Sequence, residues 1–430
     1  MTNKHNLTEE LTDLIIGKDA GNISTKITYI NSSGELVNFT IPTVIAKAPE
    51  TAVHYGGDIE VTDVSLEDYL HVRVNSNSLD KTDNNQSWFV GDLAKDDQNK
   101  IQPVVEDGAA EDKFSENNRK LFIIPVLTGI AVAALENGLK NVEVPLSIGL
   151  PSETYLKQEQ ILKQRFLGTH TITFVDGAYR NETVQIHIAP ETAQIHAEAV
   201  TTVLALRLDV KKNKLVKNPL FDNLNGKPYI LSDLGAGTND SSAFDANGLN
   251  KVITRQFAAK QGKGTNLYID AILEEIIQLD EFKMQREMMG DSLSGNKSPE
   301  LSSRETFMKN IIKPTVAKVV NAELKQEEVK FKISWGAKRN VDITEIVLKH
   351  MKAYADEQIK ILHSLWNIFD AEASIVVGGG VLFGYLGGLN NLEEQGFTLP
   401  DLANSQYFTS KSYAIAAYIL NNAAKNSVKA

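Results

Sequence analysis

The stretch IIGKDAGNISTKI, residues 15–27, runs an apolar strand into Asp19, turns at Gly21, and returns as a second strand that carries Lys26. Two interpretations of this turn are open: an ordinary β-hairpin with solvated charges, or a hairpin whose turn faces phosphates. Glycine lets backbone N–H groups approach phosphate closely, and a strand-end carboxylate can hold a hydrated Mg²⁺ against it. On the phosphate interpretation, the nucleotide-binding residues of this hairpin are Gly21, Asn22, Ser24, Thr25 and Lys26.

The same construction returns half a chain later in YILSDLGAGTNDSSAF, residues 229–244. Asp233 ends an apolar strand, Gly235 and Gly237 remove side chains from two nearby positions, and Thr238 offers a hydroxyl group. Two such hairpins, each following an apolar strand, indicate two related halves and not a short-period repeat.

A third turn lies in SIVVGGGVLFGYL, residues 374–386, where an apolar strand meets Gly378, Gly379 and Gly380. A tight strand-to-helix turn would explain three glycines. They would equally let the backbone lie flat against a planar ligand, because crevices at the carboxyl ends of strands are where α/β sheets bind ligands.

The composition limits the possible classes of protein. With 430 residues, two domains are the first expectation. A net charge of −11 argues against a large surface that grips nucleic acid directly, because such binding needs lysine and arginine against phosphate. The chain has no cysteine, which excludes disulfides and thiolate metal sites and fits the cytoplasm. No apolar run reaches the roughly 18–20 residues that span a bilayer, so no membrane contact is expected.

Strand and helix patterns alternate along the chain and predict an α/β layered fold. A polar, turn-rich segment at 212–228 separates the halves, and 95–118 is expected to be a surface loop. Strands are expected from residue 35 to about residue 42, and at residues 87–94, 141–151, 172–175 and 184–188. Helices are expected at residues 119–139, 155–166, 191–206, 267–279, 307–323, 344–369 and 411–424.

In their order, the three turns resemble the nucleotide fingerprint of the superfamily of actin, sugar kinases and heat-shock chaperones. Within it the chain resembles the ParM-like bacterial actins that segregate plasmids, through FTIPTVIA, SWFVGDLA, SIGLPSETY, IAPETAQ and QGKGTNLYIDAI. The resemblance implies two related ribonuclease-H-like domains, 13–215 with 400–430 and 216–399, around a nucleotide cleft. Ser410, Lys411 and Ser412 depart from it, because related chains tend to carry a glycine there.

The resemblance also implies roles for residues. Asp19 and Asp233 would organise Mg²⁺ through water and contribute to catalysis. The bound nucleotide would be ATP or GTP, and Gly378–Gly380 would lie against its nucleoside, which is adenosine in ATP. Gly264 and Thr265 would approach the ribose or the phosphates. Glu191, after Pro190, would position the attacking water, with Gln194 as the second candidate; the alternative is a glutamate that only serves the dipole of a helix start.

The expected function is that of a nucleotide triphosphatase that polymerises into filaments and moves plasmid DNA through a ParR-like DNA-binding adaptor. The rival classes are a small-molecule kinase and a regulatory ATPase that does not polymerise. The chain has no H-E-x-x-H metal motif and no G-x-S-x-G nucleophile elbow. Met284, Met288 and Met289 have helical spacing and are expected in a core or on a helix flank.

Overall fold

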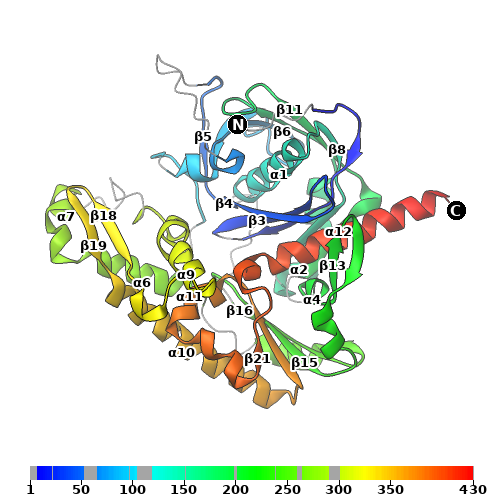
Figure 1. The fold of residues 1–430 in the computed structure, drawn as a ribbon. Coiled ribbons are helices and arrows are strands. Elements are labelled where there is room, and N and C mark those ends of the chain that lie inside the picture. Colours follow the sequence, from blue (N-terminus) through cyan, green and yellow to red (C-terminus); the bar gives the residue numbers. More distant parts are fainter. Residues whose placement is uncertain are drawn as a thin grey trace. The chain divides into compact units, whose positions relative to one another are not determined.

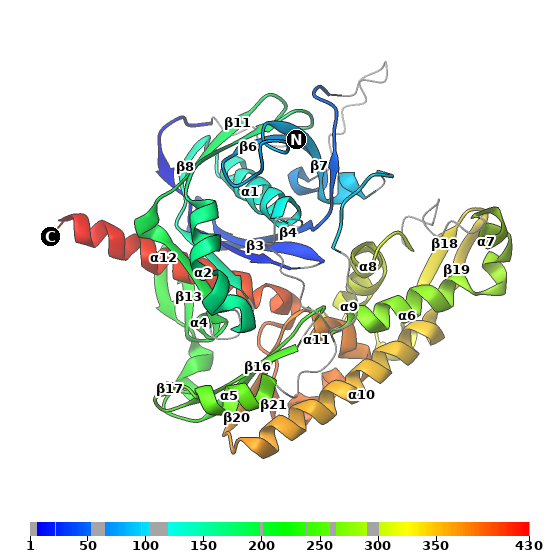
Figure 2. The same cartoon turned by 180° about the vertical axis from the view of Figure 1, so that it is seen from behind.

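A computed structural model describes residues 7–21, 23–52, 65–95, 97–103, 119–150, 152–197, 201–237, 239–258, 264–289 and 301–429. The chain forms two compact units (Figures 1 and 2). Unit 1 comprises Met1–Phe221 with Thr409–Ala430, and unit 2 comprises Asp222–Phe408. The expected loop at 95–118 lies mostly outside the described residues.

Unit 1 contains two large mixed sheets. In the five-stranded sheet β2 pairs antiparallel with β3 and parallel with β9, which in turn pairs parallel with β12. Its strands in order are β12 (Ala193–Ala197), β9 (Leu146–Leu150), β2 (Ile16–Ala20), β3 (Ser24–Ile30) and β4 (Leu36–Pro42). The seven-stranded sheet runs β1 (Thr12–Asp13), β8 (Asn141–Glu143), β11 (Thr183–Ile188), β10 (Gly168–Phe174), β6 (Leu70–Ser76), β7 (Gln86–Val90) and β5 (Ile45–Lys47).

Helix α1 (Arg119–Glu136) contacts strands of both sheets and fills the core of unit 1. It is apolar on every side, as a helix buried all round must be, and all its residues from Leu121 to Leu135 are buried. Gly129 allows close approach to the sheet, since a Cβ atom there would lie 1.9 Å from Cδ1 of Ile27. No helix among the described residues is long and apolar enough to cross a membrane.

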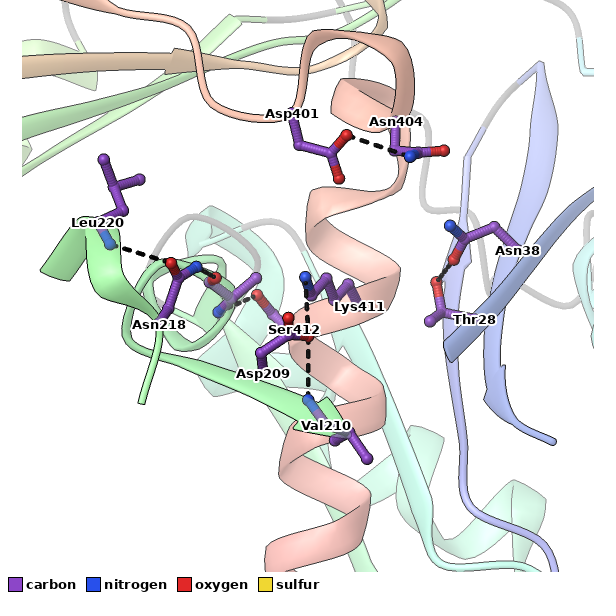
Figure 3. Close-up of polar contacts among 11 residues, drawn as sticks. Thr28, Asn38, Asp209, Val210, Asn218, Leu220, Asp401, Asn404, Lys411 and Ser412 are labelled. Carbon is purple, nitrogen blue, oxygen red and sulfur yellow. Dashed lines mark hydrogen bonds and ion pairs between the residues drawn. The ribbon is translucent and has the colours of Figure 1, made fainter. Parts of the chain in front are cut away.

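Helix α12 (Phe408–Lys429) packs against β2 and closes the other face of the five-stranded sheet. A Cβ atom on Gly17 would lie 2.1 Å from the carbonyl oxygen of Ser410, so only glycine fits at this crossing. The hydroxyls of Ser410 and Thr28 are hydrogen-bonded at 2.7 Å. Nζ of Lys411 lies 3.1 Å from Oδ1 of Asp209 (Figure 3). Ser410 and Lys411, two of the three residues that depart from related sequences, therefore help to hold α12 in place.

The remaining elements of unit 1 lie around these sheets. They are α2 (Ser152–Phe166), α4 (Val203–Arg207) and the hairpin of β13 (Leu208–Lys211) and β14 (Lys214–Lys217). The hydroxyl of Ser412 accepts a hydrogen bond from the backbone N–H of Ala205 and donates one to the carbonyl of Thr202, which joins α12 to the α4 segment.

Unit 2 repeats the arrangement at the first hairpin, because β15 pairs antiparallel with β16 and parallel with β20. Its sheet runs β17 (Gly248–Leu249), β16 (Asn239–Asp245), β15 (Tyr229–Leu234), β20 (Ala373–Val377) and β21 (Phe397–Thr398). The helices are α5 (Lys251–Ala258), α6 (Asn266–Ile277), α7 (Lys283–Met289), α8 (Arg304–Phe307), α9 (Lys313–Val320), α10 (Thr344–Ile368) and α11 (Gly379–Gly384). A small hairpin pairs β18 (Lys332–Trp335) with β19 (Lys338–Asp342).

Two expectations about local structure are wrong. The helix predicted at 191–206 is a short 3-10 turn (Pro190–Thr192), then strand β12, then the short helix α4. Pairing with β9 overrides the helical spacing, and His196 lies on this strand. The single strand predicted at 141–151 is two strands in different sheets, β8 and β9, separated at Pro145, which has no N–H to donate to a ladder.

Candidate functional site

The turn between β2 and β3 carries the first candidate residues. Asp19 and Lys26 face each other across the two strands, with Nζ of Lys26 at 3.1 Å from Oδ2 of Asp19. The backbone N–H of Gly21 donates to the carbonyl oxygens of Asp19 and Ser24, and the hydroxyl of Thr43 donates to the carbonyl of Gly21 at 2.8 Å. A Cβ atom at Gly21 would lie 2.8 Å from the Ser24 carbonyl, so the tight turn requires glycine.

Two other predicted residues of this hairpin are buried, and a third is not described by the structure. Ser24 and Thr25 are both buried, and the Thr25 hydroxyl has no hydrogen-bond partner among the described residues. Asn22 lies outside the described residues.

Lys18, which the sequence interpretation did not single out, is fully buried in unit 1. It shares a face of β2 with Ile16 and Ala20, opposite to Asp19, and stands next to Ile27 and Ile148 in the register. Its ammonium nitrogen has no hydrogen-bond partner among the described residues, and burial lowers the pKa of Lys18 to about 7. The alternation of side chains between the two faces of a strand could have identified Lys18, because it places Lys18 on the same face as the apolar Ile16 and Ala20.

In unit 2 the chain returns to the Asp233 hairpin at Gly264. A Cβ atom on Gly264 would lie 2.3 Å from the carbonyl oxygen of Ala236, so the two loops meet without side chains between them. Three backbone hydrogen bonds join them: Gly264 to Gly237 (3.2 Å), Thr265 to Gly235 (3.4 Å) and Asn266 to Ala236 (2.9 Å). Thr238 lies outside the described residues.

The triple glycine packs on the same hairpin. Gly378 has φ 102°, a conformation that favours glycine, and a Cβ atom there would lie 2.3 Å from Oδ1 of Asp233. A Cβ atom on Gly380 would lie 2.2 Å from the hydroxyl oxygen of Tyr354, whereas Gly379 has ordinary room. Because β15 and β20 are parallel, the Asp233 turn and the Gly378 turn share the carboxyl edge of one sheet.

Glu191 is exposed in the 3-10 turn before β12, so its predicted position at the start of a helix is wrong. In the parallel register of β12 and β9, Ala193 stands opposite Leu146 and Ala197 opposite Leu150. The carboxyl ends of β12, β9 and β2 therefore lie together at the Asp19 turn. Glu191 enters β12 at the other end, roughly 16 Å or more away at 3.3 Å per residue, and Gln194 is exposed near that same end.

Two histidines of unit 1 have structural roles, and two of the methionines singled out in the sequence lie on the surface. His187 bonds the side chains of Asn141 and Thr169, and His196 bonds Ser147 at 2.9 Å. Met284 and Met288 are exposed on α7, on a helix flank and not in a core.

Comparisons with known proteins identify the fold and the family of this chain. Residues 17–200 match the family described as actin like proteins N terminal domain. Bacillus thuringiensis ParM with ATP has 35% sequence identity and a TM-score of 0.73, over 95% of this chain and 99% of that chain. The same protein with ADP has 34% identity and a TM-score of 0.71, over 95% and 99%. The actin-like protein Alp7A, with 14% identity, a TM-score of 0.61 and coverage of 96% and 97%, supports the fold alone. Curated protein sequences give no match.

Fold and matches together define an actin-like protein, and they confirm the expected two-domain α/β architecture. Within that class the chain belongs to the ParM family of bacterial actins, to which its sequence showed resemblance.

Proposed function

We propose that this protein is an NTPase that polymerises into filaments on binding ATP or GTP with Mg²⁺, and that the filaments segregate plasmid DNA through a ParR-like adaptor. One observation carries the proposal: the Asp233 hairpin, the Gly264 loop and the Gly378 turn converge at one sheet edge in unit 2. Bacillus thuringiensis ParM, at about a third identity, has structures with ATP, ADP and AMPPNP.

The residues fit a magnesium nucleotide. Gly264 and Gly378 let the three backbone segments meet, because a Cβ atom on Gly264 would lie against the Ala236 carbonyl and one on Gly378 against Asp233. Backbone N–H groups of glycine-rich turns are suited to bind phosphate. Among the described residues no three histidine or acidic side chains gather as a metal cage, which suits Mg²⁺ held by water, phosphate oxygens and one or two carboxylates. Bound Mg²⁺ would neutralise charge that develops on the phosphates. Asp233 and Asp19 would orient its water ligands, and Lys26 would bind phosphate oxygen.

We assign the water-positioning role to Glu198 in place of Glu191. Glu198 follows Ala197 in the sequence, and Ala197 ends β12 at the carboxyl edge that it shares with the Asp19 turn. Glu198 itself lies outside the described residues. The strand order supports this proposal because it places the carboxyl end of β12, and not Glu191, at the edge that carries the Asp19 turn.

The first experiment follows 90° light scattering and phosphate release together, with purified protein, Mg²⁺ and ATP or GTP. A rise in scattering that decays as phosphate appears is expected for a dynamic filament. Nucleotide hydrolysis with flat scattering would refute polymerisation, and an absence of both would refute the nucleotide site.

Glu198→Ala and Glu191→Ala form a matched pair for the catalytic assignment. Glu198→Ala should assemble but release phosphate roughly 10²–10⁴-fold more slowly, and Glu191→Ala should behave as the wild type. The reverse result would return the role to Glu191.

A further inference from the structure

One turn of α10 presents three polar side chains on a single face of the helix. Tyr354, Glu357 and Gln358 are spaced i, i+3 and i+4, the spacing at which helical side chains are neighbours. Tyr354 and Gln358 are both fully buried, which is unusual for polar groups without a specific partner. The helix runs along α6 in both views of the fold (Figures 1 and 2).

Gln358 binds the second hairpin. Its Oε1 accepts a hydrogen bond of 2.6 Å from Nδ2 of Asn239, and both side chains are buried. Asn239 begins β16 and stands opposite Leu234 in the register, so it anchors the strand that leaves the Gly235–Gly237 turn. Loss of the Gln358 amide would remove this buried hydrogen bond, which contributes roughly 0.5–1.5 kcal/mol.

Tyr354 reaches the triple-glycine turn. Its hydroxyl occupies the space that a side chain at Gly380 would need. Burial raises the pKa of Tyr354 well above its usual value, with smaller contributions from Tyr268 and from the charge of Asp233. The hydroxyl is therefore a neutral donor. It has no hydrogen-bond partner among the described residues, although the side chain is fully buried. A buried unpaired hydroxyl calls for a partner such as a water or ligand atom.

Glu357 holds the third segment. It accepts a hydrogen bond from the hydroxyl of Tyr268, in the first turn of α6 that follows Gly264 and Thr265. The Tyr268 ring also packs edge-on against Tyr354, with centroids 5.3 Å apart. This one turn of α10 thus contacts the elements that carry all three backbone segments.

We propose that Tyr354, Glu357 and Gln358 form a positioning turn that couples nucleotide binding to the packing of α10, with the Tyr354 hydroxyl donating to a water or oxygen atom that arrives with the magnesium nucleotide beside Asp233. The inference rests on the proposed function. The inference goes beyond the proposed function because it assigns a new role to α10: this helix sets the spacing between the Asp233 hairpin, the Gly264 loop and the Gly378 turn.

The test measures binding of fluorescent ADP with Mg²⁺, the rate of phosphate release, and the melting temperature without nucleotide. Tyr354→Phe should weaken binding or slow release roughly tenfold, the effect of one hydrogen bond, with an unchanged or higher melting temperature. A purely structural tyrosine would instead lower the melting temperature and leave binding alone. Gln358→Leu is the second variant and should impair binding as well.

Two buried residues of unit 2 away from the site supply matched controls. Tyr229→Phe alters the opposite end of β15 from Asp233, and Gln285→Leu alters α7; neither should change nucleotide affinity. Wild-type affinity and release rate in both Tyr354→Phe and Gln358→Leu would overturn the inference. Failure of the wild type itself to bind the nucleotide would instead overturn the proposed function.

Hydrogen–deuterium exchange of the wild type provides a readout without any variant. Magnesium ADP should slow exchange in the α10 segment 351–362, beyond the turns that contact the nucleotide. An unchanged α10 in a protein that demonstrably binds ADP would contradict the coupling.

Discussion

Replacing Lys18 with methionine should stabilise unit 1, and by an amount that depends on pH. The buried ammonium is penalised because no group replaces its lost water, and its pKa falls from 10.5 to about 7. That difference corresponds to at most about 5 kcal/mol between the charged and neutral forms. Methionine has a similar length and no charge, so it keeps the packing next to Ile27 and Ile148.

The sign follows from proton binding. Between pH 7 and 10.5 the unfolded chain keeps the Lys18 proton and the folded chain loses it, so the wild-type free energy of unfolding rises with pH by about 1.4 kcal/mol per pH unit. Below the folded pKa of about 7 the penalty is fully present. Lys18→Met should therefore exceed the wild type by several kcal/mol at pH 6.5, and the advantage should shrink steadily toward pH 10.

Urea unfolding across this pH range is the assay. Trp88 is buried in unit 1, so its fluorescence reports that unit once Trp335 and Trp366 of unit 2 are replaced by phenylalanine. Ile16→Met is the control on the same face of β2, and its effect should not vary with pH. An equal pH dependence in the wild type and Lys18→Met would refute the reasoning.

Three further predictions concern packing, the loop at the nucleotide site, and acid stability. Gly264→Ala places a methyl group 2.3 Å from the Ala236 carbonyl and should weaken binding of fluorescent ADP at least roughly tenfold; unchanged affinity would show that this loop does not contact the nucleotide. Ser410→Ala leaves the buried Thr28 with one fewer partner and should lower the free energy of unfolding of unit 1 by roughly 1–3 kcal/mol in urea titrations. Lys425→Ala, at the exposed end of α12, is the control and should lower it by less. Burial lowers the pKa of His196 from 6.5 to about 4, so the unfolded chain takes up its proton first as pH falls. The wild type should then lose about 3 kcal/mol of stability between pH 6.5 and 4, and an acid denaturation curve of His196→Gln with the same slope would contradict this.

The turns of the candidate site could be predicted because their chemistry is local. Asp233, Gly235 and Gly237 lie within five residues at the end of a strand, and this short pattern predicts a turn without bulky side chains. Gly378, which follows an apolar strand, predicts a second turn of this kind. The structure adds what local sequence cannot contain, namely that Gly378 packs on Asp233 although 145 residues separate them.

Errors arose where pairing between distant strands decides the outcome. The edge on which Glu191 lies depends on the parallel pairing of β12 with β9, and the helical spacing of residues 191–206 gives no sign of it. Likewise the spacing of Tyr354 and Gln358 is visible in the sequence, but their contacts with Gly380 and Asn239 follow only from the position of α10.

The crossing of Gly17 with Ser410 also bears on how the chain folds during synthesis. Strand β2 is translated early, yet the helix that covers it is made only after the roughly 190 residues of unit 2 (222–408). At about 5–20 residues per second this is a delay of roughly 10–40 s. Through that interval the nascent N-terminal half exposes the part of β2 and β3 that α12 later covers, so unit 2 can complete its folding on the ribosome before unit 1 does, and chaperones have a defined surface to protect.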